Sequence, residues 1–303
     1  MPEHRKGLLA GVGAYFLWGL FPLYWPLLEP AKPVEILAHR IVWSFVFLAV
    51  VLAATIGFRW VRTLGRRRAL LLALAAVLIT VNWGTFIHGV NSDQVVEVSL
   101  GYFINPLVTV ALGVTVLRER LSRPQQVAVL IAAAAVVLLA LDYGRPPWIA
   151  LTLAFSFGLY GLIKKHVGVD GTQSLAVETA VLVVPALAYL AWLEADGSAT
   201  FATEGAGHIA LLAFGGVATA VPLMLFGAAA IRIPLSTVGL LQYIAPSIQF
   251  LIGVGLNHEA MPLSRLAGFA LVWVALATFT ADAVRKARRS ARAAHPVPVA
   301  EPT

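Results

Sequence analysis

The sequence contains no cysteine in its 303 residues. This excludes disulfide bonds, cysteine-held iron–sulfur clusters and a cysteine nucleophile, and it leaves the redox compartment open. Charged residues are also scarce, at 12% of the chain against roughly 25% in soluble proteins. So few charges cannot cover the surface of a water-soluble protein of this length. The composition therefore predicts a protein whose solvent is lipid.

Short catalytic motifs are missing as well. The chain has no Gly-Lys-Ser/Thr phosphate-binding loop, no His-Glu-x-x-His zinc motif and no clear Ser/His nucleophile pairing. We therefore expect a protein that is not an enzyme and that holds no cofactor and no metal. The net charge of +7 does not indicate nucleic acid, because the basic residues lie between apolar runs instead of on one soluble face.

Long apolar runs are what the chain does have, since 59% of its residues are hydrophobic. A helix of about 20 apolar residues crosses a bilayer, and a backbone in lipid must satisfy its own hydrogen bonds. The pattern predicts an all-α polytopic membrane protein. The expected helices are 7–28, 36–56, 70–90, 95–117, 125–141, 147–164, 176–193, 207–231, 235–256 and 264–282.

Lysine and arginine are distributed unevenly between the predicted loops. With the N-terminus in the cytoplasm, 18 of the 22 fall in cytoplasmic segments, and the exceptions are Lys32, Arg40, Arg145 and Arg265. Cytoplasmic loops carry an excess of these residues in membrane proteins. We predict that both termini are cytoplasmic and that 285–303 is a basic, disordered cytoplasmic tail.

The chain resembles itself at an offset of 140 residues. The segment Leu100–Pro106 lies over Leu240–Pro246, and Glu119 lies over Glu259 in the same register. We interpret 1–141 and 142–284 as two five-helix repeats. Because five is an odd number, the second repeat enters the membrane from the opposite side. Inverted repeats are typical of secondary transporters, which bind their substrate near the midplane between the halves.

Five segments together resemble the RarD family of EamA-type transporters, in the drug/metabolite transporter superfamily. They are Ala14–Gly19 (AYFLWG), Glu35–Ser44 (EILAHRIVWS), Ser99–Leu107 (SLGYFINPL), Ala154–Gly161 (AFSFGLYG) and Gln242–Pro246 (QYIAP). The resemblance covers essentially the whole membrane region. It implies a permease of the cytoplasmic membrane with a central cavity lined by helices of both halves.

Ionisable residues within the predicted helices suggest two pairs, because unpaired charges in a membrane are costly. His39 and Arg40 share one end of the bundle with Glu97, so an Arg40–Glu97 pair is feasible, as a structural contact or as an outer gate. At the other end Lys164 can pair with Glu178, or it can reach the lipid headgroups instead.

Neutral polar and aromatic residues near the middle of the bilayer are the candidates for binding substrate. Asn105 and Gln242 stand out because they lie close to Pro106 and Pro246, and matching Pro-broken helices in two halves indicate a binding site. Helix-to-helix hydrogen bonding is the alternative for these amides. The remaining candidates are Tyr102, Tyr243, Trp18, Asn82 and Tyr160.

The function that the sequence favours is secondary transport of a small organic metabolite or drug-like solute by alternating access, with efflux as the expected direction. An intramembrane enzyme and a structural or receptor-like membrane protein are the alternatives, but alternating access gives a reason for an inverted repeat and they do not. The expected partners are a small-molecule substrate and the lipid bilayer, with a homodimer left open and no nucleic acid.

Overall fold

The protein is helical throughout the part of the chain that the structure describes. In this computed structural model the described residues are 3–92, 94–143 and 146–256, with scattered helical positions between 266 and 285, and no strand occurs among them. The predicted tail therefore lies outside the described residues apart from Arg285, as does about half of the predicted helix 264–282. The α-helices are α1 (Glu3–Gly19), α2 (Pro33–Ala54), α3 (Arg66–Asn91), α4 (Val95–Thr115), α5 (Arg123–Tyr143), α6 (Trp148–Val167), α7 (Gly171–Ala195), α8 (Ala206–Arg232), α9 (Leu235–Leu241) and α10 (Ile244–Gly255).

Six segments of the described part are long and apolar enough to cross a membrane. They are Glu3–Leu23, Pro33–Ala54, Arg66–Gly89, Gly171–Ala195, Ala206–Arg232 and Leu235–Ile252. The apolar part of α4, Leu100–Thr115, is shorter than this criterion requires. The protein is thus a multi-pass helical membrane protein, and six of the ten expected spans meet the criterion of length and apolarity.

The first predicted helix ends earlier than the sequence suggested. Instead of running to Leu28, α1 ends at Gly19, and two short 3-10 turns follow, η1 (Phe21–Leu23) and η2 (Trp25–Leu28). Pro22 has no N–H for the carbonyl of Trp18, and its ring would clash with that carbonyl in a continuing helix. The side-chain amide of Gln249 donates to this carbonyl at 3.2 Å instead.

The two repeated proline segments differ in structure. α4 continues through Pro106 as a single helix, so the prediction of a break there was wrong. In the second segment α9 ends at Leu241 and α10 begins at Ile244. Pro246 lies in the first turn of α10, and the break falls at Gln242, whose carbonyl would have needed the missing N–H of Pro246.

The helices pack closely where glycines face a neighbouring backbone. α8 packs against both α1 and α2, while α6 packs against both α3 and α4. At Gly216 of α8, an added Cβ would lie 2.6 Å from the backbone nitrogen of Ser44 in α2. At Gly239 of α9, it would lie 2.8 Å from the carbonyl oxygen of Pro106 in α4. Only glycine allows the backbones to approach this closely without displacement.

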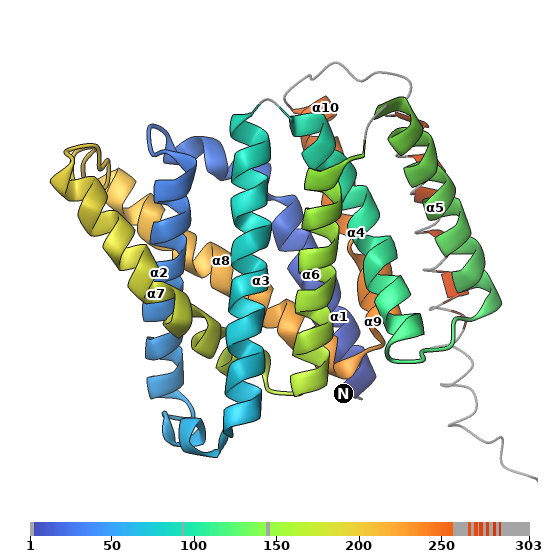
Figure 1. The fold of residues 1–303 in the computed structure, drawn as a ribbon, viewed down its shortest axis with the longest axis horizontal. Helices are drawn as coiled ribbons and strands as arrows, with labels where there is room; N and C mark the ends of the chain where they lie inside the picture. The colour runs from blue at the N-terminus through green and yellow to red at the C-terminus, as the bar shows by residue number, and fades with distance from the viewer. Residues whose placement is uncertain are drawn as a thin grey trace, which may run out of the picture.

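The bundle has two ends, and polar contacts identify which helix termini meet at each. At the N-terminal end, Glu3 at the start of α1 pairs with Arg232 at the end of α8 at 3.0 Å. Figure 1 shows α9 near this end and α10 near the opposite end, with α2 and α7 on one side of the bundle, α5 on the other, and α8 running diagonally from the α2–α7 side toward the N-terminal end. At the opposite end, the carboxylate of Glu97 near the start of α4 accepts a hydrogen bond from the backbone of Ile149 near the start of α6, at 2.7 Å.

Candidate functional site

A cavity of about 330 Å³ lies in the half of the bundle away from the N-terminal end. Its walls come from α1 with the following 3-10 turns, from α2, α3, α4, α6 and α8, and from the α9–α10 segment. The lining residues are Tyr15, Trp18, Phe21, Pro22, Trp25, Arg40, Ile79, Asn82, Trp83, Phe86, Gly101, Tyr102, Asn105, Leu153, Phe157, Leu223, Gln242, Ala245, Pro246 and Gln249. Both halves of the chain contribute, as expected for a site between two repeats.

Aromatic rings form the inner wall of the cavity. Trp18 packs against Phe157 of α6 and Phe226 of α8, with ring centroids 5.9 Å apart in each case. Behind them Tyr160 stacks on Phe226 at 5.7 Å. Offset and edge-to-face contacts of this kind fix the orientation of the rings. The cavity therefore presents a rigid apolar surface beside its few polar groups.

Arg40 lies on the wall of this cavity, and the predicted Arg40–Glu97 ion pair is not formed. The Nε of Arg40 donates to the hydroxyl of Thr219 in α8 at 2.7 Å, while Glu97 accepts from the backbone of Ile149. The physical reason lies in the packing. α2 packs against α7 and α8, whereas α4 packs against α6 and α9, so a common height in the bundle does not bring the two side chains together.

Two of the predicted amides line the cavity, as Asn105 and Gln242 were expected to do. Gln242 also donates to the hydroxyl of Thr109 in α4 at 3.0 Å, so it joins the α9–α10 segment to α4. Its Oε1 is buried and has no hydrogen-bond partner in the structure. The hydroxyl of Tyr15, on the same cavity wall, is likewise buried without a partner. Both atoms are enclosed by the protein, and the two side chains lie close to each other.

Asn82 reaches the cavity too, although its side chain is already engaged. Its amide donates to the carbonyl of Leu153 at 2.8 Å and to the hydroxyl of Ser156 at 3.0 Å, both in α6. Gln249 replaces the backbone donor that Pro22 lacks, as described above. These two amides therefore hold helices together while they line the cavity.

The three predicted tyrosines lie in different places. Tyr102 lines the cavity and is 44% exposed. Tyr243 is fully buried and is not among the lining residues, and its hydroxyl donates to the carbonyl of Phe103 at 3.4 Å. Tyr160 is also fully buried and donates to Glu178. The helical ranges fixed the heights of these residues but not the direction in which each ring points.

His39 does not face the cavity. Its ring is buried and stacks on Phe201, in the segment between α7 and α8, with centroids 4.5 Å apart. Nearby, the fully buried Glu35 accepts hydrogen bonds from the backbone and the hydroxyl of Thr200 at 2.7 and 3.1 Å. This group fastens the start of α2 to the α7–α8 connection.

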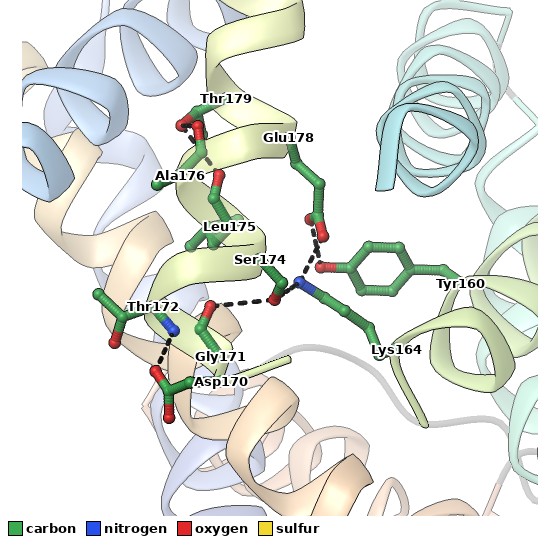
Figure 2. A network of polar contacts seen from close by, with 10 residues as sticks. All are labelled: Tyr160, Lys164, Asp170, Gly171, Thr172, Ser174, Leu175, Ala176, Glu178 and Thr179. Carbon is green, nitrogen blue, oxygen red and sulfur yellow. Dashed lines mark hydrogen bonds and ion pairs between the residues drawn. The ribbon is translucent and has the colours of Figure 1, made fainter. Parts of the chain in front are cut away.

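Lys164 of α6 and Glu178 of α7 form a buried ion pair at 2.5 Å, with both side chains only 1% exposed. Figure 2 shows the ammonium of Lys164 and the ring of Tyr160 converging on the Glu178 carboxylate. Tyr160 donates to it at 2.9 Å, and Lys164 also donates to the hydroxyl of Ser174 at 2.7 Å. Of the two alternatives for Lys164, pairing is the one observed, and the side chain is buried between α6 and α7.

At the N-terminal end of the bundle, side chains cap helix termini and join neighbouring elements. Glu119, in the loop after α4, accepts hydrogen bonds from the backbone nitrogens of Leu235 and Ser236 at the start of α9, at 2.7 and 2.8 Å. Lys165 donates to the carbonyl of Ile233, just after α8, at 2.6 Å. A carboxylate at a helix N-terminus and an ammonium at a C-terminus both complement the helix dipole.

Several cavity residues were not predicted from the sequence, among them Phe21, Trp25 and Trp83. Trp25 follows Pro22 in a segment that was expected to be helical, so its position depends on a break that the apolar pattern did not reveal. Trp83 lies one residue after Asn82, and that proximity was an available signal. Within the described part, no three His, Asp or Glu side chains converge as a metal site would require.

Comparison with known proteins agrees with the geometry. Residues 5–141 match the EamA-like transporter family. Protein RarD of Streptomyces exfoliatus is 58% identical over 95% of this chain and 92% of its own length, and Protein RarD of Escherichia coli is 40% identical over 96% and 99%. An uncharacterized transporter of Bacillus subtilis, YojE, is 46% identical over 95% and 98%.

A solved crystal structure with 16% sequence identity superposes with a TM-score of 0.70, covering 90% of this chain and 96% of its own. This likeness concerns the fold alone. The full-length sequence matches go further. The chain belongs to the RarD family of EamA-like transporters.

Proposed function

We propose that this protein is a secondary transporter of the cytoplasmic membrane that moves a small organic solute by alternating access. The observation that carries the proposal is the position of the cavity. It lies in one half of the bundle and is walled by both halves of the chain, while at the other end Glu119 and Lys165 bind helix termini and join neighbouring elements. A solute site reached from one side, with a closed opposite side, is one of the two states that alternating access requires.

The contacts of the closed side support this proposal, because they join segments that would have to separate. Glu119 links the α4–α5 loop of the first proposed repeat to α9 of the second. Glu3 and Arg232 link α1 to α8 across the same boundary. These are few, partly exposed polar contacts, and such contacts can break and re-form at modest cost.

The exchange of packing partners supports two inverted repeats at 1–141 and 142–284. If each helix is matched with the helix five places later, α1 corresponds to α6 and α3 corresponds to α8. The contact of α1 with α8 then corresponds to the contact of α6 with α3. Likewise α6 packs against α4, and α1 packs against α9 and α10. A pseudo-two-fold axis between the halves would produce this pattern.

The basic asymmetry supports an N-terminal end in the cytoplasm, so that the cavity faces outward in this conformation. Efflux is the proposed direction, by analogy with the family. Release to the outside then takes place from the conformation described here, and loading takes place after the N-terminal end has opened.

Single cysteines test the proposed access, because the natural chain has none. Phe86→Cys lines the cavity, and we expect a membrane-impermeant maleimide to label it from outside intact cells. Val77→Cys on the same helix is the control, because Val77 is 53% exposed on the outer surface of the bundle and should face lipid. Ser236→Cys, at the closed end, should resist the reagent from outside. Labelling of Phe86→Cys from the cytoplasmic side only would contradict the outward-facing assignment.

A further inference from the structure

The cavity carries an unbalanced positive charge. Among the described residues that line it, Arg40 alone is charged, and the other polar groups are neutral amides and tyrosine hydroxyls. A charge at membrane depth is normally paired with an opposite charge or with backbone carbonyls. Arg40 has neither kind of partner, since its one hydrogen bond goes to the hydroxyl of Thr219.

Thr219 and three aromatic rings hold the guanidinium in a fixed position. The Thr219 hydroxyl donates to the carbonyl of Gly215 at 2.7 Å and therefore presents its oxygen to Nε of Arg40. The guanidinium carbon lies 4.6 Å from the ring centroid of Trp25 and 5.1 Å from that of Trp83, with Phe21 further away at 6.0 Å. Such rings stabilise the cation without neutralising it.

The terminal amino groups of Arg40 are left without a partner in the described structure. The single hydrogen bond uses Nε, so the two terminal nitrogens keep all their donors. A guanidinium whose end is free and whose plane is fixed binds a planar two-oxygen group with two parallel hydrogen bonds. A carboxylate has this shape, and its single negative charge equals the single positive charge of the cavity.

The rest of the cavity suits the remainder of such a molecule. The rings of Trp18, Phe86 and Phe157 offer an apolar surface, and the neutral amides Asn105 and Gln242 line the same cavity. A volume of about 330 Å³ is near the lower limit for small-molecule sites, which are commonly 300–1,000 Å³. The space therefore fits a compact molecule with one apolar body.

We propose that the cavity binds a small organic monoanion, with its carboxylate on the terminal amino groups of Arg40 and its apolar or aromatic body between the rings. This inference rests on the proposed function, whose transported solute it identifies by class. An organic cation would meet the charge of Arg40 in a partly desolvated site with no carboxylate to balance it. A phosphate dianion would need a second cation, and the described lining residues supply none.

Three probes of nearly equal size separate charge from shape, namely phenylacetate, phenylacetamide and 2-phenylethylamine. Binding to the purified full-length protein is followed by quenching of tryptophan fluorescence and by the shift of melting temperature. We expect phenylacetate to bind at least about tenfold more tightly than either other probe, the ratio for one charge-assisted hydrogen bond. Equal binding of the three, or no binding of phenylacetate, overturns the proposal.

Variants then locate the charge. Arg40→Gln should abolish the preference for phenylacetate, and Arg40→Lys should recover only part of it because an ammonium lacks the planar fork. Thr219→Val removes the contact that fixes Nε and should weaken phenylacetate several-fold while the charge remains. Arg68→Gln is the matched control, since it removes the same charge from an exposed position at the start of α3. An Arg40→Gln protein that folds and still prefers phenylacetate also overturns the proposal.

Should Arg40→Gln fail to fold, Thr219→Val and the three probes still decide the question. Proteoliposomes distinguish this inference from the proposed function. Selective phenylacetate binding without any protein-dependent movement across the vesicle membrane would leave the anion site in place and contradict transport. Movement of phenylethylamine in preference to phenylacetate would support transport and overturn the anion site.

Discussion

Lys164 and Glu178 place two opposite charges inside the bundle, each with a second polar partner. Lys164 also donates to Ser174, and Glu178 also accepts from Tyr160, so the ions are hydrogen-bonded as well as paired. Taking two ions out of water is expensive, and a buried pair is weak evidence for stability by itself. The loss of one partner is a different matter, because the other charge then has no compensation.

We expect Lys164→Met to destabilise the protein by about 3–5 kcal/mol, because the carboxylate of Glu178 would be left buried and unpaired. The double variant Lys164→Met with Glu178→Gln should lose less than the sum of the two single losses. Thermal melting in detergent measures all three. Lys6→Met is the control, since Lys6 forms an exposed pair with Glu3 and its loss should not change the melting temperature measurably. Additive losses would contradict the pairing.

Gln242 has two roles that can be separated by mutation. It bonds to Thr109 and it also faces the cavity, whereas Thr109 is buried outside the lining. Thr109→Val removes this hydrogen bond without changing the cavity wall and should cost about 1 kcal/mol of stability.

Gln242→Ala should cost a similar amount of stability and also weaken solute binding by about 1–3 kcal/mol, and Asn105→Ala should weaken binding with less effect on stability. Melting temperature and probe affinity are measured on the same samples. If affinity is unchanged in both cavity variants, the amides serve only to join helices.

At the level of single residues, the sequence predicted the type and depth of the cavity residues better than the direction in which each side chain points. Arg40, Asn105, Gln242, Trp18 and Tyr102 were selected for their type and depth, and all of them line the cavity. Tyr243 and Tyr160 have the same chemistry at comparable depths and point into the packed core. Helix rotation decides between these outcomes, and in a chain that is apolar on nearly every face no amphipathic pattern reveals it.

At the level of helices, the length of the apolar runs predicted the elements. The prolines predicted only some of the helix breaks. α2 through α8 lie within a few residues of the expected ranges. Pro22 ends α1 and Pro246 accompanies the α9–α10 break, yet α4 continues through Pro106. A proline leaves one carbonyl without its donor and clashes with it, and whether the helix breaks depends on what the neighbouring helices supply. The sequence alone does not contain that information.

Close helix packing can be tested at one glycine. At Gly216 a Cβ would lie 2.6 Å from the backbone nitrogen of Ser44, so Gly216→Ala must push α8 away from α2. We expect a loss of about 1–3 kcal/mol of stability, as for other overpacked sites. Gly84→Ala in α3 is the matched control, because no atom lies within 4 Å of its added Cβ, and alanine favours the helix by up to about 1 kcal/mol. Equal melting temperatures of the two variants would contradict the tight α2–α8 contact.

For the whole molecule, the main question is which side of the membrane the cavity faces. The cavity lies away from the N-terminal end, so the location of that end determines the answer. The α2–α3 connection and the start of α3 belong to the N-terminal end, and together they carry Arg59, Arg62, Arg66, Arg67 and Arg68. Segments this rich in arginine are retained in the cytoplasm. In the proposed orientation, the cavity and Arg40 face outward in the present conformation.

Reporter fusions test this orientation directly. A fusion after Gly57 should show cytoplasmic activity. Residues 58–68 are duplicated in the linker of this fusion, because their arginines are needed to hold the segment on the cytoplasmic side. A fusion after Asn91, the last residue of α3, should be external, since one further crossing separates the two points. A fusion after Ala195, at the end of α7, is an independent check on the second half and should also be external. A cytoplasmic signal at Asn91 would turn the cavity toward the cytoplasm. The outward-facing assignment and the proposed release to the outside would then be wrong. The inference about Arg40 would remain, because it depends on the contacts within the cavity and not on the side from which the cavity is reached.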